Sequence, residues 1–473
     1  MPAAGAPAGS AYSYWMPRLS FLGAAQTVTG SKHLVNTGRS QVLVDAGLFQ
    51  GHKELRLRNW AELPVHARDL EAIVLTHAHL DHVGYLPRLV SQGFRGRVFC
   101  TPGTMDLAKL VLVDSANLQE EDARQANREG YSRHNPALPL YTVADAWRAL
   151  SQLQPVGFDR EVTVAPGVEI SFVPMGHLLG SAAVRMRLAG GPTVVFGGDL
   201  GRFNRPVLRD PHLIQHADYL LVESTYGDRQ HEPDDDGARL AAIIAETAEK
   251  KGRVIIPAFA VGRVEEVLYW IKKLEAERRI PVLPVYLDSP MATEALSFYG
   301  HRVSELDPEF AENGGRLAGF LTRRFTSVTS TQQSKDLVRS EKPAIVISSS
   351  GMATGGRVLH YLRATLPDPR NTILFVGYQA AGTRGRQLVD GAKQVKMHGR
   401  FIDVHARIEK IDSMSAHADA GEIVRWLRGF TKPPTMTYLV HGEPTAQAAL
   451  ATRIGSELGW KTHIPAHEET VEI

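Results

Sequence analysis

Six short hydrophobic runs in this chain share one pattern of apolar and polar positions. In each of them, apolar residues lead to an Asp, Glu or His and then to a turn, and the runs lie at residues 42–45, 73–77, 172–177, 194–199, 220–223 and 438–441. Apolar runs of this length, bounded by glycine and polar residues, are typical of buried strands. Because the ligand-type residues follow the strands at their ends, the pattern predicts a metal site along one edge of a sheet.

The middle of the chain has a different pattern, in which predicted strands and helices alternate. Strands are expected at 254–256, 285–287, 344–347 and 373–376, and helices near 263–279, 292–300 and 357–366. In the first of these helices, apolar residues recur with the spacing of one buried helical face, at Val264, Val267, Leu268, Ile271 and Leu274. Regular alternation of strands and helices predicts a parallel sheet.

The regions on either side of this middle part share their own pattern. Residues 19–199 predict many strands broken by glycine turns, with helices at 81–92 and 106–130, and helices are expected again near 420–429 and 445–459. Ligand-type residues occur on both sides of the middle part, so they can serve one site only if both chain ends form one domain. We expect a disordered lead at 1–15, a metal-site domain built from 16–207 and 395–473, and an inserted parallel α/β domain at 208–394.

Composition narrows the class of protein and its compartment. The chain has 473 residues, one cysteine, Cys100, and a formal net charge of +2. A single cysteine excludes intrachain disulfides and Cys-rich zinc modules, and it fits a reducing cytoplasm. No apolar stretch approaches the roughly 18–20 residues that a membrane helix needs, and the N-terminal residues lack the features of a secretory signal. We therefore expect a cytoplasmic protein with no membrane partner, in which any nucleic-acid site is locally basic.

The densest chemical signal is the segment His-Ala-His-Leu-Asp-His at residues 77–82. It places four potential metal ligands within six residues of a chain that has only 19 histidines. The first two histidines can face one ion, and the aspartate and last histidine, past a turn, can face a second. Imidazole and carboxylate ligands without thiolate suit zinc in an open, catalytic site.

Three later residues can complete such a pair of sites. His177 and His441 could each add an imidazole to one ion, and Asp199 could bridge both. A lone histidine after a strand is usually structural, but the shared position of these residues at strand ends favours the metal interpretation. Two ions about 3.5–4 Å apart can clamp both sides of an in-line displacement at phosphorus.

The segment at 77–82 is the hallmark of the metallo-β-lactamase fold, and three further motifs resemble one branch of it, the β-CASP ribonucleases. The motifs are Leu-Leu-Val-Glu-Ser-Thr-Tyr-Gly with Glu223, Met-Ser-Ala-His-Ala-Asp with His417, and Val-His-Gly-Glu with His441. That branch includes the nuclease subunit of the cleavage and polyadenylation factor and ribonuclease J. The resemblance covers the chain from about Met16, and it implies an α/β fold: a metallo-β-lactamase αββα sandwich with an inserted parallel α/β (β-CASP) domain.

The resemblance also implies a role for each candidate residue. It assigns two Zn²⁺ per chain to ligands that share one bridging residue: His77, His79 and His177 for the first ion, Asp81, His82 and His441 for the second, and Asp199 between them. Asp45 would orient ligands rather than bind metal. Zinc hydroxide would attack phosphorus, and a general acid, held by a carboxylate, would protonate the leaving 3′ oxygen. The catalytic residues implied are His417 as this acid, Glu223 as its carboxylate, Asp81 and Asp199.

Two further segments could contact the substrate. Three serines and a glycine follow a predicted strand and precede a helix, so their hydroxyl and backbone N–H groups could cradle a phosphate: Ser348, Ser349, Ser350 and Gly351. Such residues also simply cap helices, but the resemblance favours the phosphate interpretation. Residues 384–410 carry seven Lys and Arg against three Asp and Glu, and this stretch could contact a nucleic-acid backbone.

Together these features predict a dinuclear zinc phosphodiesterase that cleaves single-stranded RNA, most simply as an endonuclease in RNA processing or degradation. A hydrolase of small thioesters or lactones is less compatible with the long insert and the Glu223 and His417 pair. A DNA nuclease of the Artemis branch commonly lacks the last histidine, which is His441 here. A catalytically silent RNA-binding subunit would have lost ligands. A 5′-exonuclease mode, protein partners and a homodimer stay open.

Overall fold

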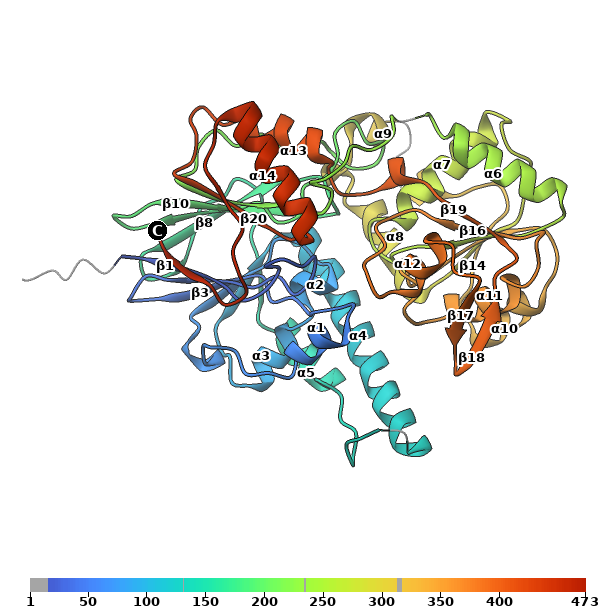
Figure 1. The fold of residues 1–473 in the computed structure, drawn as a ribbon, viewed down its shortest axis with the longest axis horizontal. Helices are drawn as coiled ribbons and strands as arrows, with labels where there is room; N and C mark the ends of the chain where they lie inside the picture. The colour runs from blue at the N-terminus through green and yellow to red at the C-terminus, as the bar shows by residue number, and fades with distance from the viewer. Residues whose placement is uncertain (1–15, 131, 234, 313–316) are drawn as a thin grey trace, which may run out of the picture.

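The computed structural model describes residues 16–130, 132–233, 235–312 and 317–473. The expected disordered lead at 1–15 lies outside the described residues. Two bodies lie side by side, one containing both ends of the described chain and the other containing its middle (Figure 1). Among the described residues, no helix combines the length and hydrophobicity that crossing a membrane requires.

The first body, the metal-site domain, contains two seven-stranded sheets. In spatial order the first sheet consists of β22 (Thr470–Glu472), β1 (Arg18–Phe21), β2 (His33–Asn36), β3 (Gln41–Val44), β4 (Ala72–Val74), β5 (Arg97–Cys100) and β6 (Leu153–Pro155). The second consists of β21 (Thr462–His463), β20 (Met436–Val440), β11 (Tyr219–Glu223), β10 (Thr193–Phe196), β9 (Ala182–Leu188), β8 (Val168–Pro174) and β7 (Val162–Ala165).

Hydrophobic side chains join the two sheets face to face and attach helices to their outer faces. One buried cluster unites Val42 and Val74 of the first sheet with Phe172 and Val194 of the second. The outer face of the first sheet is covered by α3 (Leu86–Ser91), α4 (Pro102–Glu129) and α5 (Val143–Leu150), and that of the second by α13 (Ala420–Leu427) and α14 (Pro444–Leu458). This arrangement confirms the predicted αββα sandwich.

The second body, the inserted domain, is built on one six-stranded sheet whose strands are all parallel. Its order is β14 (Phe325–Ser327), β13 (Val285–Asp288), β15 (Ile345–Ser348), β12 (Val254–Pro257), β16 (Thr372–Phe375) and β19 (Arg407–Lys410). Its helices are α6 (Ala238–Glu249), α7 (Val264–Ala276), α8 (Pro290–His301), α9 (Pro308–Glu312), α10 (Thr331–Arg339), α11 (Val358–Thr365) and α12 (Arg384–Val389). The apolar face predicted for the helix near 263–279 is the buried face of α7.

Both predicted boundaries of the insert lie too early in the chain. Strand β11 follows residue 207, yet it pairs with β10 and β20 inside the metal-site domain. Strand β19 follows residue 394, yet it pairs with β16 inside the inserted domain. A small antiparallel hairpin of β17 (Gln394–Met397) and β18 (Arg400–Asp403) precedes it. A change of sequence pattern marks a loop, whereas the domain to which a strand belongs is decided by the strands with which it pairs.

Helix ends also differ from the expected ones, for local reasons. The helix expected at 81–92 is divided into α2 (Leu80–Val83) and α3, which has proline in its first turn. The helix expected at 106–130 begins earlier, at Pro102, because the Thr101 side chain caps it by accepting a hydrogen bond from the Thr104 N–H. The remaining helical elements are α1 (Lys53–Arg58) and the short 3₁₀ turns Ala67–Asp69, Val303–Glu305, Leu317–Phe320 and Asp412–Met414.

Candidate metal centre

The ends of the strands bring the candidate residues to one edge of the two facing sheets. Parallel pairing of β3 with β4, and of β10 and β20 with β11, places their carboxyl ends together. The predicted ligands follow these ends: the 77–82 segment lies after β4, Asp199 after β10 and His441 after β20, while His177 follows β8. All seven predicted ligands fall into two close groups.

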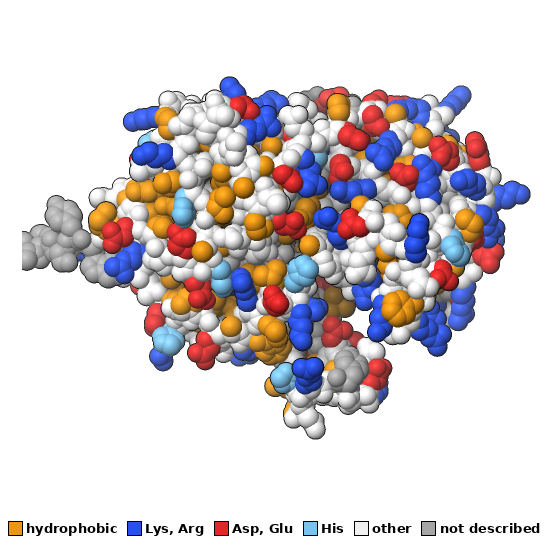
Figure 2. Space-filling model, in the orientation of Figure 1, with side chains coloured by type: hydrophobic (Ala, Val, Ile, Leu, Met, Phe, Trp, Pro, Cys, Tyr) orange, Lys and Arg blue, Asp and Glu red, His pale blue; other side chains and the backbone are white. Residues whose placement is uncertain are grey.

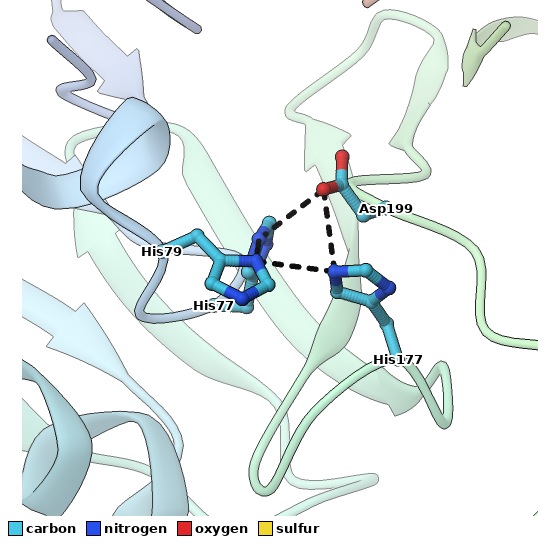
Figure 3. A group of neighbouring side chains, drawn as sticks. All are labelled: His77, His79, His177 and Asp199. Carbon is cyan, nitrogen blue, oxygen red and sulfur yellow. Dashed lines mark hydrogen bonds and ion pairs between the residues drawn. The ribbon is translucent and has the colours of Figure 1, made fainter. Parts of the chain in front are cut away.

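The first group consists of three imidazoles and one carboxylate (Figure 3). The Nδ1 atom of His79 lies 3.1 Å from the Nε2 atoms of both His77 and His177. The Oδ2 atom of Asp199 lies 3.4 Å from the same two Nε2 atoms. A tetrahedron with metal–ligand bonds of about 2.0–2.1 Å has edges of roughly 3.3–3.4 Å, so this spacing matches one zinc ion.

The second group consists of Asp81, His82 and His441. The Nε2 atom of His441 lies 3.4 Å from Oδ2 of Asp81. The other oxygen of Asp199, Oδ1, lies 3.3 Å from Nε2 of His82 and 3.6 Å from Nδ1 of His441. Each carboxylate oxygen of Asp199 therefore faces a different group, which is the arrangement that a bridging ligand needs.

A buried oxygen supports the fit of this second group to a cation. Oδ1 of Asp199 is buried and accepts no hydrogen bond from any described residue. Burying a charged oxygen that accepts no hydrogen bond is costly, and a metal ion between this oxygen and the imidazoles of His82 and His441 would reduce that cost. The donor set, imidazole and carboxylate with no thiolate, is one that suits zinc.

The protonation states of the first group are those that metal binding requires. Burial lowers the pKa of His77 and His177, and it lowers the pKa of His79 to about 3. Burial by itself would raise the pKa of Asp199, but the adjacent His441 and His82 outweigh it and hold that pKa well below its usual range. Neutral imidazoles and an ionised carboxylate are the forms that bind a metal.

Asp45 lies behind the ligands, in contact with one of them. Its carboxylate accepts hydrogen bonds from the N–H and the hydroxyl of Thr76, both at 2.8 Å, and lies 2.7 Å from Nδ1 of His82. Burial would lower the pKa of His82, but the carboxylates of Asp199 and Asp45 outweigh it and raise that pKa. Asp45 thereby turns the Nε2 atom of His82 toward Asp199.

His417, which is partly buried, and Glu223, which is fully buried, form a pair beside the first group. A backbone bridge between Gly201 and His417 brings the two distant segments together. Nδ1 of His417 lies 3.0 and 3.1 Å from the two oxygens of Glu223, one of which also accepts from the Leu200 N–H. Burial lowers the pKa of His417, but the Glu223 carboxylate outweighs it and raises the pKa to about 9. The ring is therefore protonated near neutral pH.

This arrangement leaves the second ring nitrogen of His417, Nε2, available to donate a hydrogen bond. Within the described part of the chain, no group forms a hydrogen bond with its Nε2. Glu223 also lies within 4.8 Å of Asp199 and His441, so it could be taken for a metal ligand. Its two oxygens are already engaged by His417 and the Leu200 N–H, which favours its role as the partner of His417.

Three residues around the site were not predicted. The hydroxyl of Thr225 lies 3.0 Å from Nδ1 of His441, and Nε2 of His231 lies 3.0 Å from the backbone oxygen of His417. The ring of Phe259, which comes from the inserted domain, lies 6.3 Å from that of His79. Thr225 could have been found from its place two residues after Glu223, whereas no sequence signal distinguishes Phe259 from an ordinary apolar residue.

The serine loop lies at the carboxyl end of β15, and the structure corrects one part of its predicted role. Ser348 is fully buried, and its hydroxyl donates to the backbone oxygen of Asp288, so this side chain is not free to bind a phosphate. Ser349 and Ser350 remain half-buried, and Gly351 adjoins Phe259 so closely that a Cβ there would lie 2.7 Å from its ring. Of the four residues, Ser349 and Ser350 are partly exposed, whereas Gly351 is buried.

Comparison with known proteins places the whole chain among related sequences. Three family models match it: a Beta-lactamase superfamily domain at 40–282, a Beta-Casp domain at 264–388 and a Zn-dependent metallo-hydrolase RNA specificity domain at 402–465. The chain is 37% identical to Ribonuclease TTHA0252 of Thermus thermophilus, covering 92% of this chain and 95% of that protein. It is 32% identical to the transcription termination factor FttA of Pyrococcus abyssi, covering 98% of this chain and 72% of that protein.

A solved structure has the same fold at low sequence identity. A protein of unknown function from Enterococcus faecalis matches with a TM-score of 0.51 and 15% identity, over 97% of this chain and all of that one. At this identity, the match concerns the fold alone.

Proposed function

This chain belongs to the β-CASP family of the metallo-β-lactamase superfamily, and we propose that it is a zinc-dependent ribonuclease that hydrolyses phosphodiester bonds of single-stranded RNA. It is a metal-dependent hydrolase that acts on RNA. The name of its relative, Ribonuclease TTHA0252, and the match to a metallo-hydrolase RNA specificity domain support this activity. The observation that carries the proposal is the pair of His417 and Glu223, which lies directly beside the two metal-binding groups. A subunit that only binds RNA would need neither the pair nor a complete set of ligands.

In the proposed site, residues from both ends of the chain would hold two zinc ions. His77, His79 and His177 would hold one ion, Asp81, His82 and His441 would hold the other, and Asp199 would be shared by both. When bound, zinc would activate water and stabilise the negative charge that develops on the phosphate.

The remaining residues position groups and move one proton. Asp45 and Thr76 fix the orientation of the His82 ring. Glu223 stabilises the protonated ring of His417, whose Nε2–H donates its proton to the 3′ oxygen that leaves phosphorus. The serine loop of the inserted domain is proposed to bind a neighbouring phosphate through Ser349, Ser350 and Gly351.

Purified protein is expected to contain about two zinc ions per chain, because the ligands form two groups made of the residue types that bind zinc. Elemental analysis of protein purified with zinc present throughout measures this directly. His405→Ala is the matched control, since this histidine contacts the Pro367 backbone outside the site and should leave the zinc content unchanged. A zinc content near zero under these conditions would contradict the assignment of the ligands.

Cleavage products are expected to carry a 5′ phosphate and a 3′ hydroxyl. In the proposed reaction water is the nucleophile, so the 2′-hydroxyl of RNA takes no part in the chemistry. End-group analysis of the products from an RNA cut at a single site tests this. Single-stranded DNA of the same sequence is the control, and slow cutting of it is expected, with RNA preferred through contacts to the 2′-hydroxyl. Ends with a 2′,3′-cyclic phosphate would falsify the proposed hydrolysis.

A further inference from the structure

The hairpin of β17 and β18 carries an aromatic side chain on its outer face. Val395 and Met397 point inward and are buried. Lys396 and Phe401, which are directly opposite each other in the hairpin, point outward, with the Lys396 ammonium 5.9 Å from the centre of the Phe401 ring. Phe401 is 68% exposed, the highest value among the large hydrophobic side chains of the described residues. Single exposed hydrophobic residues are common, so the exposure of this ring indicates a binding site only if the surrounding residues do so as well.

Those surroundings are rich in positive charge that the protein does not neutralise. Five cationic side chains on or next to the hairpin have no carboxylate within 4.0 Å in the described parts of the chain: Arg363, Arg384, Lys393, Lys396 and Arg400. Other cations of the same stretch do have such partners, as Arg386 has Asp390 and Lys410 has Asp412. Figure 2 shows Lys and Arg side chains gathered over the end of the inserted domain where Figure 1 places β17 and β18.

Two local features indicate that the cations near the turn of the hairpin lie on one surface. The rings of His360 and His398 stack with 5.1 Å between their centres, next to the turn of the hairpin. Burial lowers the pKa of His398, and the nearby His360, Arg363 and Arg384 lower it further, as expected in a region of positive potential. Arg384 is fixed there by a hydrogen bond of 2.7 Å to the backbone oxygen of Lys396.

A continuous series of contacts joins this hairpin to the metal centre. Arg384 also donates to the backbone oxygens of Ala353 and Thr354, at 3.1 and 3.0 Å. The hydroxyl of Thr354 lies 3.0 Å from that of Ser350 in the serine loop. The next residue of the loop, Gly351, packs on Phe259, whose ring lies near that of His79. These contacts connect the hairpin to the serine loop and to Phe259 beside the metal centre.

We propose that this hairpin surface, formed by Phe401 together with Arg363, Arg384, Lys393, Lys396 and Arg400, is a second binding site for the single-stranded RNA substrate, remote from the bond that is cut. A base stacks on the Phe401 ring, and the cations contact the phosphates on either side of it. An aromatic ring among unpaired cations is the combination with which proteins bind single strands without reading sequence. The inference rests on the proposed function, because it assigns this surface to the RNA that the metal centre cleaves.

RNA binding by the His417→Ala protein, which should cut its ligand about 10²- to 10⁴-fold more slowly, tests the proposal. Fluorescence anisotropy with uridine oligomers of increasing length measures affinity at fixed salt. Phe401→Ala should weaken binding of long oligomers by at least about fivefold, because stacking of one base contributes about 1–3 kcal/mol, and leave the shortest bound oligomers unaffected. Trp147→Ala is the matched control, since that ring is 57% exposed on α5 of the metal-site domain.

The positive charge of the surface has its own measurement. Lys396→Ala should reduce the slope of log affinity against log salt by about 0.7 for long oligomers, the value for one phosphate contact on a single strand. Arg428→Ala is the control, because this exposed guanidinium pairs with Glu457 and lies outside the surface. Cleavage of an RNA too short to reach the hairpin should be unchanged by Phe401→Ala, which also shows that the variant is folded.

Two results would overturn the proposal. One is equal affinity of the Phe401→Ala protein and its parent for oligomers of every length, which is also the result expected if the hairpin binds an acidic protein segment. The other is an equal loss for short and long oligomers. If the unmodified protein neither cuts nor binds any RNA, the proposed function itself fails, and the length series distinguishes that outcome from a failure confined to the hairpin.

Discussion

Replacing Asp199 with alanine is expected to remove both metal ions and almost all activity. The two oxygens of this carboxylate face different groups of ligands, at 3.4 Å from His77 and 3.3 Å from His82. Loss of any other single ligand leaves one group complete, whereas loss of Asp199 leaves both incomplete. Elemental analysis and RNA cleavage, measured on the same preparation of Asp199→Ala protein, check this expectation.

Asp45→Asn is the matched control, because Asp45 is a buried aspartate that touches a ligand without joining either group. Loss of such a supporting carboxylate typically reduces metal affinity or activity by about 10- to 100-fold, so this variant should retain more metal than Asp199→Ala. If Asp199→Ala protein keeps two ions per chain, Asp199 is not a bridge. If Asp45→Asn loses as much metal as Asp199→Ala, the division between ligand and supporting residue is wrong.

Replacing His417 with alanine is expected to lower the rate of cleavage by about 10²- to 10⁴-fold, the usual contribution of a general acid. The protein should nevertheless keep its fold and both metal ions, since His417 belongs to neither group of ligands. Single-turnover cleavage and zinc content, measured together, separate these effects. His441→Ala is the comparison, because it should lose metal as well as activity. Loss of zinc from the His417→Ala protein would mean that His417 is a ligand.

The pH dependence provides an independent check on the same pair. A general acid works only while it is protonated, so the rate should fall as pH rises through the pKa of His417, which the Glu223 carboxylate raises to about 9. Glu223→Gln removes the charge that raises this pKa, and the fall in rate should therefore begin at lower pH. Identical pH profiles for the Glu223→Gln protein and its parent would show that Glu223 does not act through His417.

The regular elements of both domains were predictable because their signals are local. The apolar face of α7 and the alternation of strands and helices in the inserted domain depend only on the spacing of residues near each other in the chain. The ends of elements were predicted less well. The division of the 81–92 segment and the early start of α4 depend on proline and on a threonine cap, and their effects compete with the hydrophobic pattern.

The residues of the candidate site also divide into those that the local sequence predicts and those that only the packing of distant segments reveals. Four parts of the site were recognisable in the sequence because each follows an apolar run and has side chains of types that bind zinc: the 77–82 segment, His177, Asp199 and His441. Phe259 and the hydroxyl of Thr225 adjoin the site only because distant segments pack there. Ser348 has the same residue type as Ser349 and Ser350, but burial at the end of β15 removes it from contact with a substrate.

The sequence by itself determined the candidate ligands, through hydrophobic periodicity and side-chain types, and it determined the fold class and the chemistry through the resemblance of its motifs to the β-CASP ribonucleases. Only the tertiary structure decided which domain β11 and β19 belong to, that each oxygen of Asp199 faces a different group, and that Phe401 stands exposed among unpaired cations. The physical reason is that strand pairing, burial and charge neutralisation depend on groups far apart in the chain. Glu223 and His417 are separated by 194 positions, yet their side chains lie 3.0 Å apart.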